Sequence, residues 1–187
     1  MMHFSTKKDI VSIGALDFAL YLSAREIQNR VREVAHSIEK SYKKKNPVFL
    51  VVLNGAFMFA ADLIRNMDIA CDVSFVKVSS YKGLASTGTL TVQMTNEKEL
   101  KDRHVIILED IVDSGFTMSN YLPQVLEQEP ESVEICTLLE KPDANKFEVD
   151  IKYSCFKIPD RFVIGYGLDF DGVGRNLPHI YQLSGKV

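Results

Sequence analysis

Short, uninterrupted apolar segments alternate with segments of helical period along this chain. The apolar runs at residues 48–53 (VFLVVL), 104–110 (HVIILED) and 132–139 are typical of strands that are buried on both faces. Helices are expected over residues 56–67 and 116–128, after the first two of these runs. Buried strands that alternate with helices predict an α/β fold built on a doubly wound, mostly parallel sheet.

The segment before the first buried run predicts a long amphipathic helix. Ser23 and Glu26 have the spacing of a capping box, in which the hydroxyl accepts from an early amide while the glutamate reaches back. Pro47 ends the element, shortly after basic residues that favour the negative end of the helix dipole. The apolar positions at helical spacing are Ile27, Val31, Val34, Ala35 and Ile38.

Shorter elements follow from weaker patterns. Residues 72–79, 162–166 and 179–183 are expected to be strands, and residues 89–94 one arm of a hairpin. Pro123 removes a backbone hydrogen bond from the helix after the second buried run, so we expect that helix to kink or to end early.

Length, composition and charge narrow the class of protein. With no linker or internal repeat, residues 1–187 are expected to form one domain. The net charge is −3 and no long basic block occurs, which argues against a broad attraction to nucleic acid or to membranes. No segment has the length of a membrane span and no apolar N-terminal stretch resembles a signal peptide, so a cytoplasmic location is expected.

The strongest chemical signal is the sequence VIILEDIVDSGFTM, in which a buried strand leads into acids, a turn and a helix start. In a doubly wound sheet, ligands lie beyond the carboxyl ends of the strands, and the free amides of a turn and helix N-terminus bind an anion such as phosphate. Gly115 allows the backbone to approach closely, while Ser114 and Thr117 add hydroxyl donors. Glu109 and Asp110 suit a ribose diol or a hydrated Mg²⁺.

Acids in such a position can also simply cap a helix. Here three acids within five positions, directly after a buried strand, favour a binding site. Residues 109–118 resemble the phosphoribosyl pyrophosphate (PRPP) signature of type I phosphoribosyltransferases, and are similar more closely to the hypoxanthine–guanine branch. The likeness extends from about Val48 to Leu183, with several motifs in the family's order.

The resemblance implies a fold, an oligomeric state, an activity and a cofactor for this chain. The fold would be the type I sheet with a small hood formed by the terminal segments, and the protein a homodimer or homotetramer. Its activity would be transfer of the 5-phosphoribosyl group from PRPP to a 6-oxopurine, with Mg²⁺ as cofactor, in purine salvage. Hypoxanthine, guanine or both would be the acceptor.

The resemblance also implies roles within the motif. Glu109 and Asp110 would meet the ribose hydroxyls directly or through Mg²⁺, and Asp113 would be the general base that faces a ring nitrogen of the purine. Phe116 occupies a variable position, so a role is expected only for its backbone. The phosphoribosyl-binding set is Glu109, Asp110, Asp113, Ser114, Gly115, Phe116 and Thr117.

Asn54 and Gly55 resemble the family's pyrophosphate loop, in which a strained peptide before glycine presents amides to the leaving group. Asn-Gly is also a common turn by itself. The family often has a basic residue where this chain has Asn54, so the amide contacts are expected here without an assigned charge contact. Arg175 would donate to pyrophosphate, and Asp169 would hold a second Mg²⁺. The implied metal ligands are Glu109, Asp110 and Asp169.

The segment 80–89 is rich in glycine, serine and threonine, so we expect a mobile loop. Ser80 and Tyr81, followed by residues 86–88, resemble the family's lid, whose closure would exclude water from the reacting sugar. An ordinary flexible hairpin loop would have the same composition.

The purine side is implied by two further segments. Lys141 follows the third buried run and would donate to the oxygen at purine position 6. In the segment 158–169 (IPDRFVIGYGLD), Phe162 would stack on the base and the Val163 backbone would bond its edge. Outside such a motif, a lysine at a strand end is usually solvated and a phenylalanine on a strand usually belongs to the core. The purine-binding set is Ile111, Lys141, Phe162, Val163 and Asp169.

Two other functions are left open by the sequence. A regulatory module could keep this fold and sense PRPP without turnover, although Asp113, the lid and the metal carboxylates argue against it. An enzyme for adenine or a pyrimidine conflicts with Lys141 facing an oxygen at position 6. The motifs of nucleoside triphosphatases (GxxxxGK[ST]) and dinucleotide enzymes (GxGxxG after a strand) are absent from the sequence.

Overall fold

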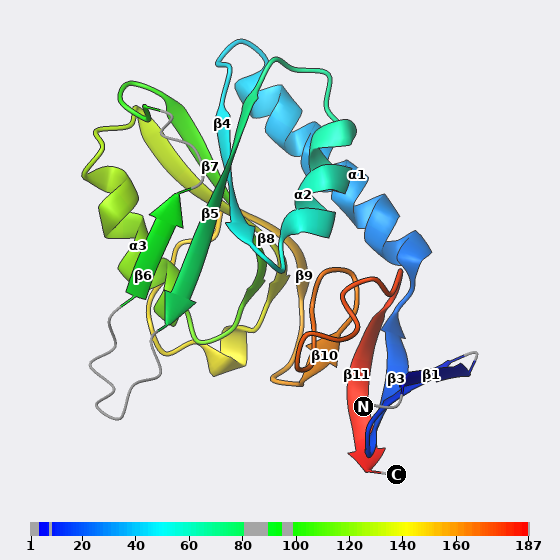
Figure 1. Ribbon diagram of the computed structural model, residues 1–187. Helices are drawn as coiled ribbons and strands as arrows, with labels where there is room; N and C mark the ends of the chain where they lie inside the picture. The colour runs from blue at the N-terminus through cyan, green and yellow to red at the C-terminus, as the bar shows by residue number, and fades with distance from the viewer. Residues whose placement is uncertain (1–3, 8, 81–89, 95–98, 187) are drawn as a thin grey trace.

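The computed structural model describes residues 4–7, 9–80, 90–94 and 99–186, which form two β-sheets (Figure 1). The strands of the larger sheet are β4 (Val48–Leu53), β5 (Asp72–Ser80), β6 (Leu90–Met94), β7 (His104–Val112), β8 (Ser132–Glu140) and β9 (Tyr153–Lys157). Their order is β6-β5-β4-β7-β8-β9. Only β6 runs antiparallel to its neighbour, so the sheet is mostly parallel, as predicted.

Helices cover both faces of this sheet. They are α1 (Ala24–Tyr42), α2 (Phe57–Arg65) and α3 (Phe116–Leu126), with a short 3₁₀ turn η1 (Pro142–Ala144). The helices α1 and α2 lie on one face and α3 on the other (Figure 1). Residues of β4 alternate between the two cores: Phe49 and Val51 pack under α1 and α2, whereas Leu50 and Val52 pack under α3. The doubly wound architecture is therefore confirmed, and it explains why this strand is apolar throughout.

Helix α1 begins as predicted. The Glu26 amide donates to Ser23 Oγ (3.3 Å), and the Ser23 amide donates to Glu26 Oε2 (2.9 Å), which completes the capping box. The predicted apolar positions are buried against the sheet. The Ala24 amide donates to His179 Nδ1 (2.8 Å), so a residue of the C-terminal part of the chain also holds the first turn.

The second sheet, which we call the hood, combines the two terminal parts of the chain. Its strands are β1 (Phe4–Lys7), β2 (Ile10–Ile13), β3 (Leu16–Leu22), β10 (Val163–Ile164) and β11 (Ile180–Lys186). They pair antiparallel in the order β1-β2-β3-β11-β10. Phe18 and Ile164 are buried in a small core of the hood's own. The expected hood is confirmed, whereas the strands of the first 22 residues had no counterpart among the predicted elements.

Several boundaries differ from the prediction. Strand β7 continues to Val112, so Asp110 lies inside the strand and not at its end. Helix α3 ends at Leu126, shortly after Pro123 and before the predicted end at residue 128. This agrees with the early end that was expected from Pro123. The predicted hairpin arm is β6, paired with β5. Strand β9 was not predicted, and β10 has only two residues. The loop was predicted at residues 80–89; Ser80 ends β5, and residues 81–89 lie outside the described residues.

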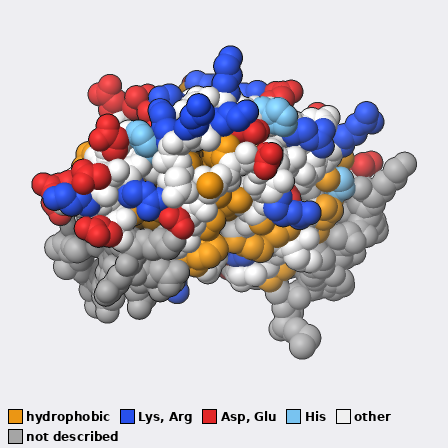
Figure 2. Space-filling view, turned by 90° about the horizontal axis from the view of Figure 1, so that it is seen from above, with side chains coloured by type: hydrophobic (Ala, Val, Ile, Leu, Met, Phe, Trp, Pro, Cys, Tyr) orange, Lys and Arg blue, Asp and Glu red, His pale blue; other side chains and the backbone are white. Residues whose placement is uncertain are grey.

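Charged side chains of both signs are intermixed on the face of the molecule seen in Figure 2. Lysine and arginine lie among aspartate and glutamate along the upper and left parts of this face, and apolar side chains gather in a band across its lower middle. Within the described part of the chain, none of the helices is long and apolar enough to cross a membrane.

Candidate active site

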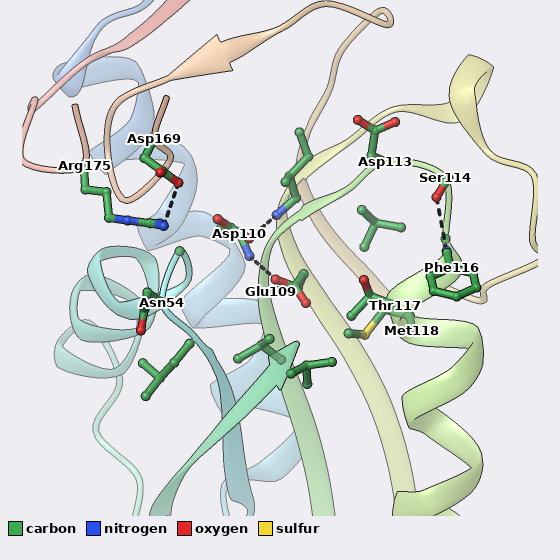
Figure 3. A pocket seen from close by; sticks show the side chains of 17 residues that line it. Asn54, Glu109, Asp110, Asp113, Ser114, Phe116, Thr117, Met118, Asp169 and Arg175 are labelled. Atoms are coloured by element: carbon green, nitrogen blue, oxygen red, sulfur yellow. Dashed lines mark hydrogen bonds and ion pairs between the residues drawn. The ribbon is translucent and has the colours of Figure 1, made fainter. Parts of the chain in front are cut away.

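A cavity of about 350 Å³ opens at the carboxyl ends of β4 and β7 (Figure 3). Its walls come from the turn after β4, from the end of β7 with the start of α3, and from the loop between β10 and β11. Most of the predicted site residues line it together: Asn54, Gly55, Glu109, Asp110, Ile111, Asp113, Ser114, Gly115, Phe116, Thr117, Asp169 and Arg175.

Glu109 and Asp110 lie in the middle of the cavity wall, between Asn54 and Arg175 on one side and the start of α3 on the other (Figure 3). Glu109 is 7% exposed; its Oε1 accepts from the Asp110 amide (3.2 Å), and its Oε2 has no hydrogen-bond partner among the described residues. Burial, and after it the negative charge of Asp110, raises the pKa of Glu109 well above its usual range. A buried oxygen without a partner next to a second carboxylate is a place that a ligand or ion can complete.

The loop from Asp113 to Gly115 connects β7 to α3 and forms an anion cradle. Gly115 is the N-cap of α3 and has a φ of 79°, in the left-handed region where glycine is favoured. Amides of the first helical turn have no acceptor within the helix, and the N-cap glycine has no side chain to cap them. The Phe116 amide donates to Ser114 Oγ at 3.4 Å, the long end of the hydrogen-bond range. These amides and the helix dipole therefore favour an anion at this end of the cavity. The Ser114 and Thr117 hydroxyls lie at the same cavity.

A segment after η1 supports this loop from behind. The Ser114 carbonyl accepts from the amides of Lys146 (2.9 Å) and Phe147 (3.1 Å). With the Asn145 side-chain amide turned so that its nitrogen faces this carbonyl, Asn145 donates to it as well (3.1 Å). A Cβ atom on Gly115 would collide with the Phe147 carbonyl. These contacts turn the Ser114 carbonyl away from the cavity, so that the loop presents amides to it. Sequence reasoning missed Asn145, because its contact depends on tertiary packing and not on a motif.

The turn after β4 approaches the acidic pair very closely. The Leu53–Asn54 peptide is cis. A Cβ atom on Gly55 would overlap the Asp110 carboxylate, and a Cβ atom on Gly167 would overlap the Gly55 carbonyl. Glycine at position 55 therefore allows this turn to lie directly against the Asp110 carboxylate.

The loop between β10 and β11 brings opposite charges to the same cavity. Arg175 Nη2 lies 2.6 Å from Asp169 Oδ1, and Arg175 Nη1 donates to the Gly167 carbonyl (2.7 Å). The Gly167 amide donates in turn to the Arg175 carbonyl (2.9 Å). The guanidinium and the carboxylate face Asp110 across the cavity (Figure 3).

A second cavity of about 230 Å³ adjoins the first. The residues that line it are Asp110, Ile111, Asp113, Lys141, Phe162, Val163, Leu168 and Asp169. Four of these, Asp110, Ile111, Asp113 and Asp169, also line the first cavity. Phe162 is 47% exposed, and its ring meets those of Phe170 (5.9 Å between centroids) and Phe18 (6.3 Å) in the hood. All of the predicted purine-binding residues thus lie around one cavity.

Lys141 makes an ion pair that the sequence did not predict. Its side chain is 6% exposed, and Nζ donates to Asp113 Oδ2 (2.6 Å) and to Asp160 Oδ1 (3.2 Å). Lys141 and Asp113, which the resemblance gives separate roles toward a purine, therefore contact each other. Asp160 was not among the predicted site residues.

The remaining predicted residues are the lid residues Ser80 and Tyr81, and Phe116, which lines the first cavity. Ser80 is the last residue of β5, and Tyr81 lies outside the described residues. The ring of Phe116 packs against that of Phe147, with 5.5 Å between centroids. This contact leaves the Phe116 backbone at the start of α3 as the part of the residue nearest the anion cradle.

Comparison with known proteins decides the family. A family model described as the phosphoribosyl transferase domain matches residues 21–171. The chain belongs to the phosphoribosyl transferase family. This family member is 38% identical over 167 residues to the hypoxanthine-guanine phosphoribosyltransferase of Streptococcus pneumoniae, covering 89% of this chain and 93% of that protein. It is 40% identical over 163 residues to the hypoxanthine-guanine-xanthine phosphoribosyltransferase of Tritrichomonas foetus, covering 87% and 89%.

Solved structures of phosphoribosyl transferases show the same fold. A hypoxanthine-guanine phosphoribosyltransferase from Bacillus anthracis superposes with a TM-score of 0.82 at 33% identity, covering 89% of this chain and 96% of that one. A hypoxanthine phosphoribosyltransferase from Staphylococcus aureus superposes with a TM-score of 0.81 at 38% identity, covering 88% and 90%. The family and fold predicted from the sequence motifs are therefore confirmed.

Glu109 predicts a pH dependence of stability for this phosphoribosyl transferase. Its pKa is raised in the folded state, whereas the unfolded chain has an ordinary value of about 4.3. The folded state then holds a proton that the unfolded state releases, so the contribution to stability is complete below pH ~4 and is lost as pH rises toward the folded pKa. Glu109→Gln, which has no proton to lose, is expected to gain about 1 kcal/mol on the wild type at pH 8.

Urea unfolding of both proteins between pH 4.5 and 8.5 measures this effect. The difference in the free energy of unfolding should grow with pH and be smallest at the acid end. Glu127→Gln, at the exposed end of α3, serves as the matched control, with no such trend. A constant difference at every pH would mean that the Glu109 carboxyl ionises as freely in the folded state as in the unfolded chain.

Proposed function

We propose that this chain transfers the 5-phosphoribosyl group from PRPP to a 6-oxopurine, hypoxanthine or guanine or both, giving IMP or GMP and pyrophosphate. The observation that carries the proposal is the pair of adjoining cavities. One contains an anion cradle and an acidic pair, and the other contains a buried ammonium and a partly exposed aromatic ring. The residues shared by both, Asp110, Ile111, Asp113 and Asp169, lie where a sugar and a base would be joined.

The larger cavity would take the donor. The loop from Asp113 to Thr117 would hold the 5-phosphate through its amides and hydroxyls, because the Ser114 carbonyl is turned to the other side. Glu109 and Asp110 would meet the ribose hydroxyls. The amide of Gly55 and the guanidinium of Arg175 would bind pyrophosphate, to which arginine gives charge-assisted hydrogen bonds. Asn54 contributes no charge there.

The residues present fit Mg²⁺. Glu109 Oε2 is a buried oxygen without a partner among the described residues, and Asp110 and Asp169 line the same cavity. Mg²⁺ is typically held by one or two carboxylates together with substrate phosphates and water. Among the described residues, no three acidic, histidine or cysteine side chains come together as a metal site by themselves, so Glu109, Asp110 and Asp169 would hold the ion only jointly with the phosphates of the donor and with water. When bound, Mg²⁺ offsets the negative charge that develops on the pyrophosphate oxygens.

The smaller cavity would take the base. Lys141 would donate to the oxygen at position 6, the Phe162 ring would lie against the purine, and the Val163 backbone and Ile111 would border its edge. Asp113 stands on the boundary between the two cavities. It would accept the proton of a purine ring nitrogen as the base reacts.

The reaction is a displacement at the anomeric carbon. The bond from this carbon to the pyrophosphate oxygen breaks with its electron pair on pyrophosphate, and a purine nitrogen supplies the pair for the new bond. The proton released from the base passes to Asp113. The carboxylates of Asp110 and Asp113 favour the positive sugar centre, while Arg175 and the amide of Gly55 favour the leaving group. Ser80 and Tyr81 belong to the lid that would close over this centre.

The same proposal includes assembly and location. Phe162 and Asp169 come from the hood side and Asp113 and Lys141 from the larger sheet, so we propose that residues 1–187 act as one domain. We further propose that the chain forms a homodimer or homotetramer and is located in the cytoplasm. Sedimentation of the purified chain measures its oligomeric state.

One assay tests the activity. Purified protein, Mg²⁺ and PRPP are incubated with hypoxanthine, guanine, xanthine, adenine or uracil, and nucleotide is quantified. Product from 6-oxopurines alone is expected. Tight PRPP binding with no product from any base would instead support a regulatory module, and product from adenine or uracil would contradict the assignment of Lys141.

A further inference from the structure

Lys141 is a buried cation with carboxylates on two sides. It follows β8, where its amide donates to the Val112 carbonyl of the neighbouring strand (3.0 Å). Its Nζ lies 2.6 Å from Asp113, in the loop before α3, and 3.2 Å from Asp160, in the loop between β9 and β10. Lys141 is 6% exposed, whereas the Asp160 side chain is 66% exposed.

We infer that Asp160 is a positioning residue, which holds the Lys141 ammonium toward purine position 6 while Asp113 is engaged with the proton of the base. The inference rests on the proposed function and adds to it a residue with no assigned role. Its basis is that one lysine contacts two carboxylates, of which only one lines the cavities.

Asp113 cannot accept the proton of the base and neutralise the charge of the Lys141 ammonium at the same time. Once it has accepted a proton it is neutral, and a buried ammonium left without a charged partner is strongly unfavourable. The other acids around the smaller cavity are Asp110 and Asp169, and Asp169 is paired with Arg175. Asp160 is the described carboxylate that stays within hydrogen-bond distance of Lys141 without lining either cavity.

The backbone fixes Asp160 in this place. The Ile158 amide donates to the Glu140 carbonyl (2.8 Å), so the loop is joined to the end of β8 directly beside Lys141. Asp160 precedes Phe162 by two residues in the same loop, and Phe162 lines the cavity together with Val163, the first residue of β10. One short segment therefore supplies both the aromatic ring against the base and the counter-charge of the lysine that faces it.

When Asp160 is removed, Asp113 is the carboxylate that remains within hydrogen-bond distance of Lys141. The ion pair between Lys141 and Asp113 should then compete with the contacts that both residues make to the base. Asp160→Asn is expected to lower kcat/KM for hypoxanthine about 10-fold, with the KM for PRPP nearly unchanged. Asp160→Glu, which keeps the charge, should recover most of the loss. Asp143→Asn, the same change on the exposed turn η1, is the matched control and should behave as the wild type.

A double-mutant cycle with Lys141→Met separates positioning from a structural role. With no ammonium to balance, Asp160→Asn should cause no further loss in the Lys141→Met protein. If Lys141→Met turns over too slowly, IMP binding by calorimetry supplies the same cycle. An equal loss in both backgrounds, or a loss that Asp160→Glu does not reduce, overturns the inference. A wild type that forms no nucleotide and binds no IMP refutes the proposed function instead.

Discussion

Asp113→Asn is expected to lower kcat about 10²–10⁴-fold while PRPP binding stays close to that of the wild type. Asparagine keeps the size of the side chain and one oxygen acceptor, but it cannot take the proton of the purine nitrogen. Asp113 stands on the boundary of the two cavities, with Oδ2 2.6 Å from Lys141 Nζ. The loss should fall on turnover because the proton moves only as the new bond forms.

Steady-state kinetics with hypoxanthine give kcat, and calorimetry with PRPP and Mg²⁺ gives donor affinity. The cradle amides that would hold the 5-phosphate are unchanged by this substitution, and Lys141 keeps Asp160 as a partner. Asp143→Asn again controls for the loss of one carboxylate near the site. Near-normal turnover by Asp113→Asn would remove this residue from the base role, and a loss of PRPP binding equal to the loss of kcat would make it a donor ligand.

The larger sheet could be predicted because its signal is local. A strand such as VFLVVL must be buried on both faces, and its alternating residues do pack into two separate cores. The start of α1 could be predicted for the same reason, since Ser23 and Glu26 satisfy each other within one turn.

The hood could not be predicted in detail because its pairing is remote in the chain. Strand β3 pairs with β11 through six residue pairs, although the two strands come from opposite parts of the sequence. Strand β10 has two residues, too few for any period to appear. Terminal strands of this kind are specified by tertiary partners more than by intrinsic preference.

The same distinction, between signals local in the sequence and contacts between remote residues, applies to the site. The turn at Asp113 to Gly115 could be recognised because strand end, acid, glycine and helix start follow one another in the sequence. Asn145 and Asp160 could not, since each acts on a residue far along the chain, Ser114 in one case and Lys141 in the other. The contact between Lys141 and Asp113 likewise appears only when β7 and β8 are placed side by side.

Gly55→Ala, which adds one methyl group, is expected to lower kcat/KM for PRPP about 10²-fold. The Cβ atom of Gly55→Ala would overlap the Asp110 carboxylate, so either this carboxylate or the turn after β4 must move. Both would contact the donor, one at the ribose and the other at pyrophosphate. Alanine can adopt the Gly55 backbone, because φ there is not positive. The effect should therefore come from displaced donor contacts and not from an unfavourable local conformation.

Gly185→Ala in β11 is the matched control, since its added Cβ atom meets nothing within 4 Å. Thermal unfolding of both variants checks that the fold is kept, and kcat/KM for PRPP is compared with that for hypoxanthine. Combining Gly55→Ala with Asp110→Ala then identifies the displaced group. If the clash acts through Asp110, the double variant should be about as active as Asp110→Ala alone, because neighbouring effects of this kind are not additive. A further 10²-fold loss in the double variant would show that Gly55 acts through its own amide at pyrophosphate and not through the carboxylate beside it.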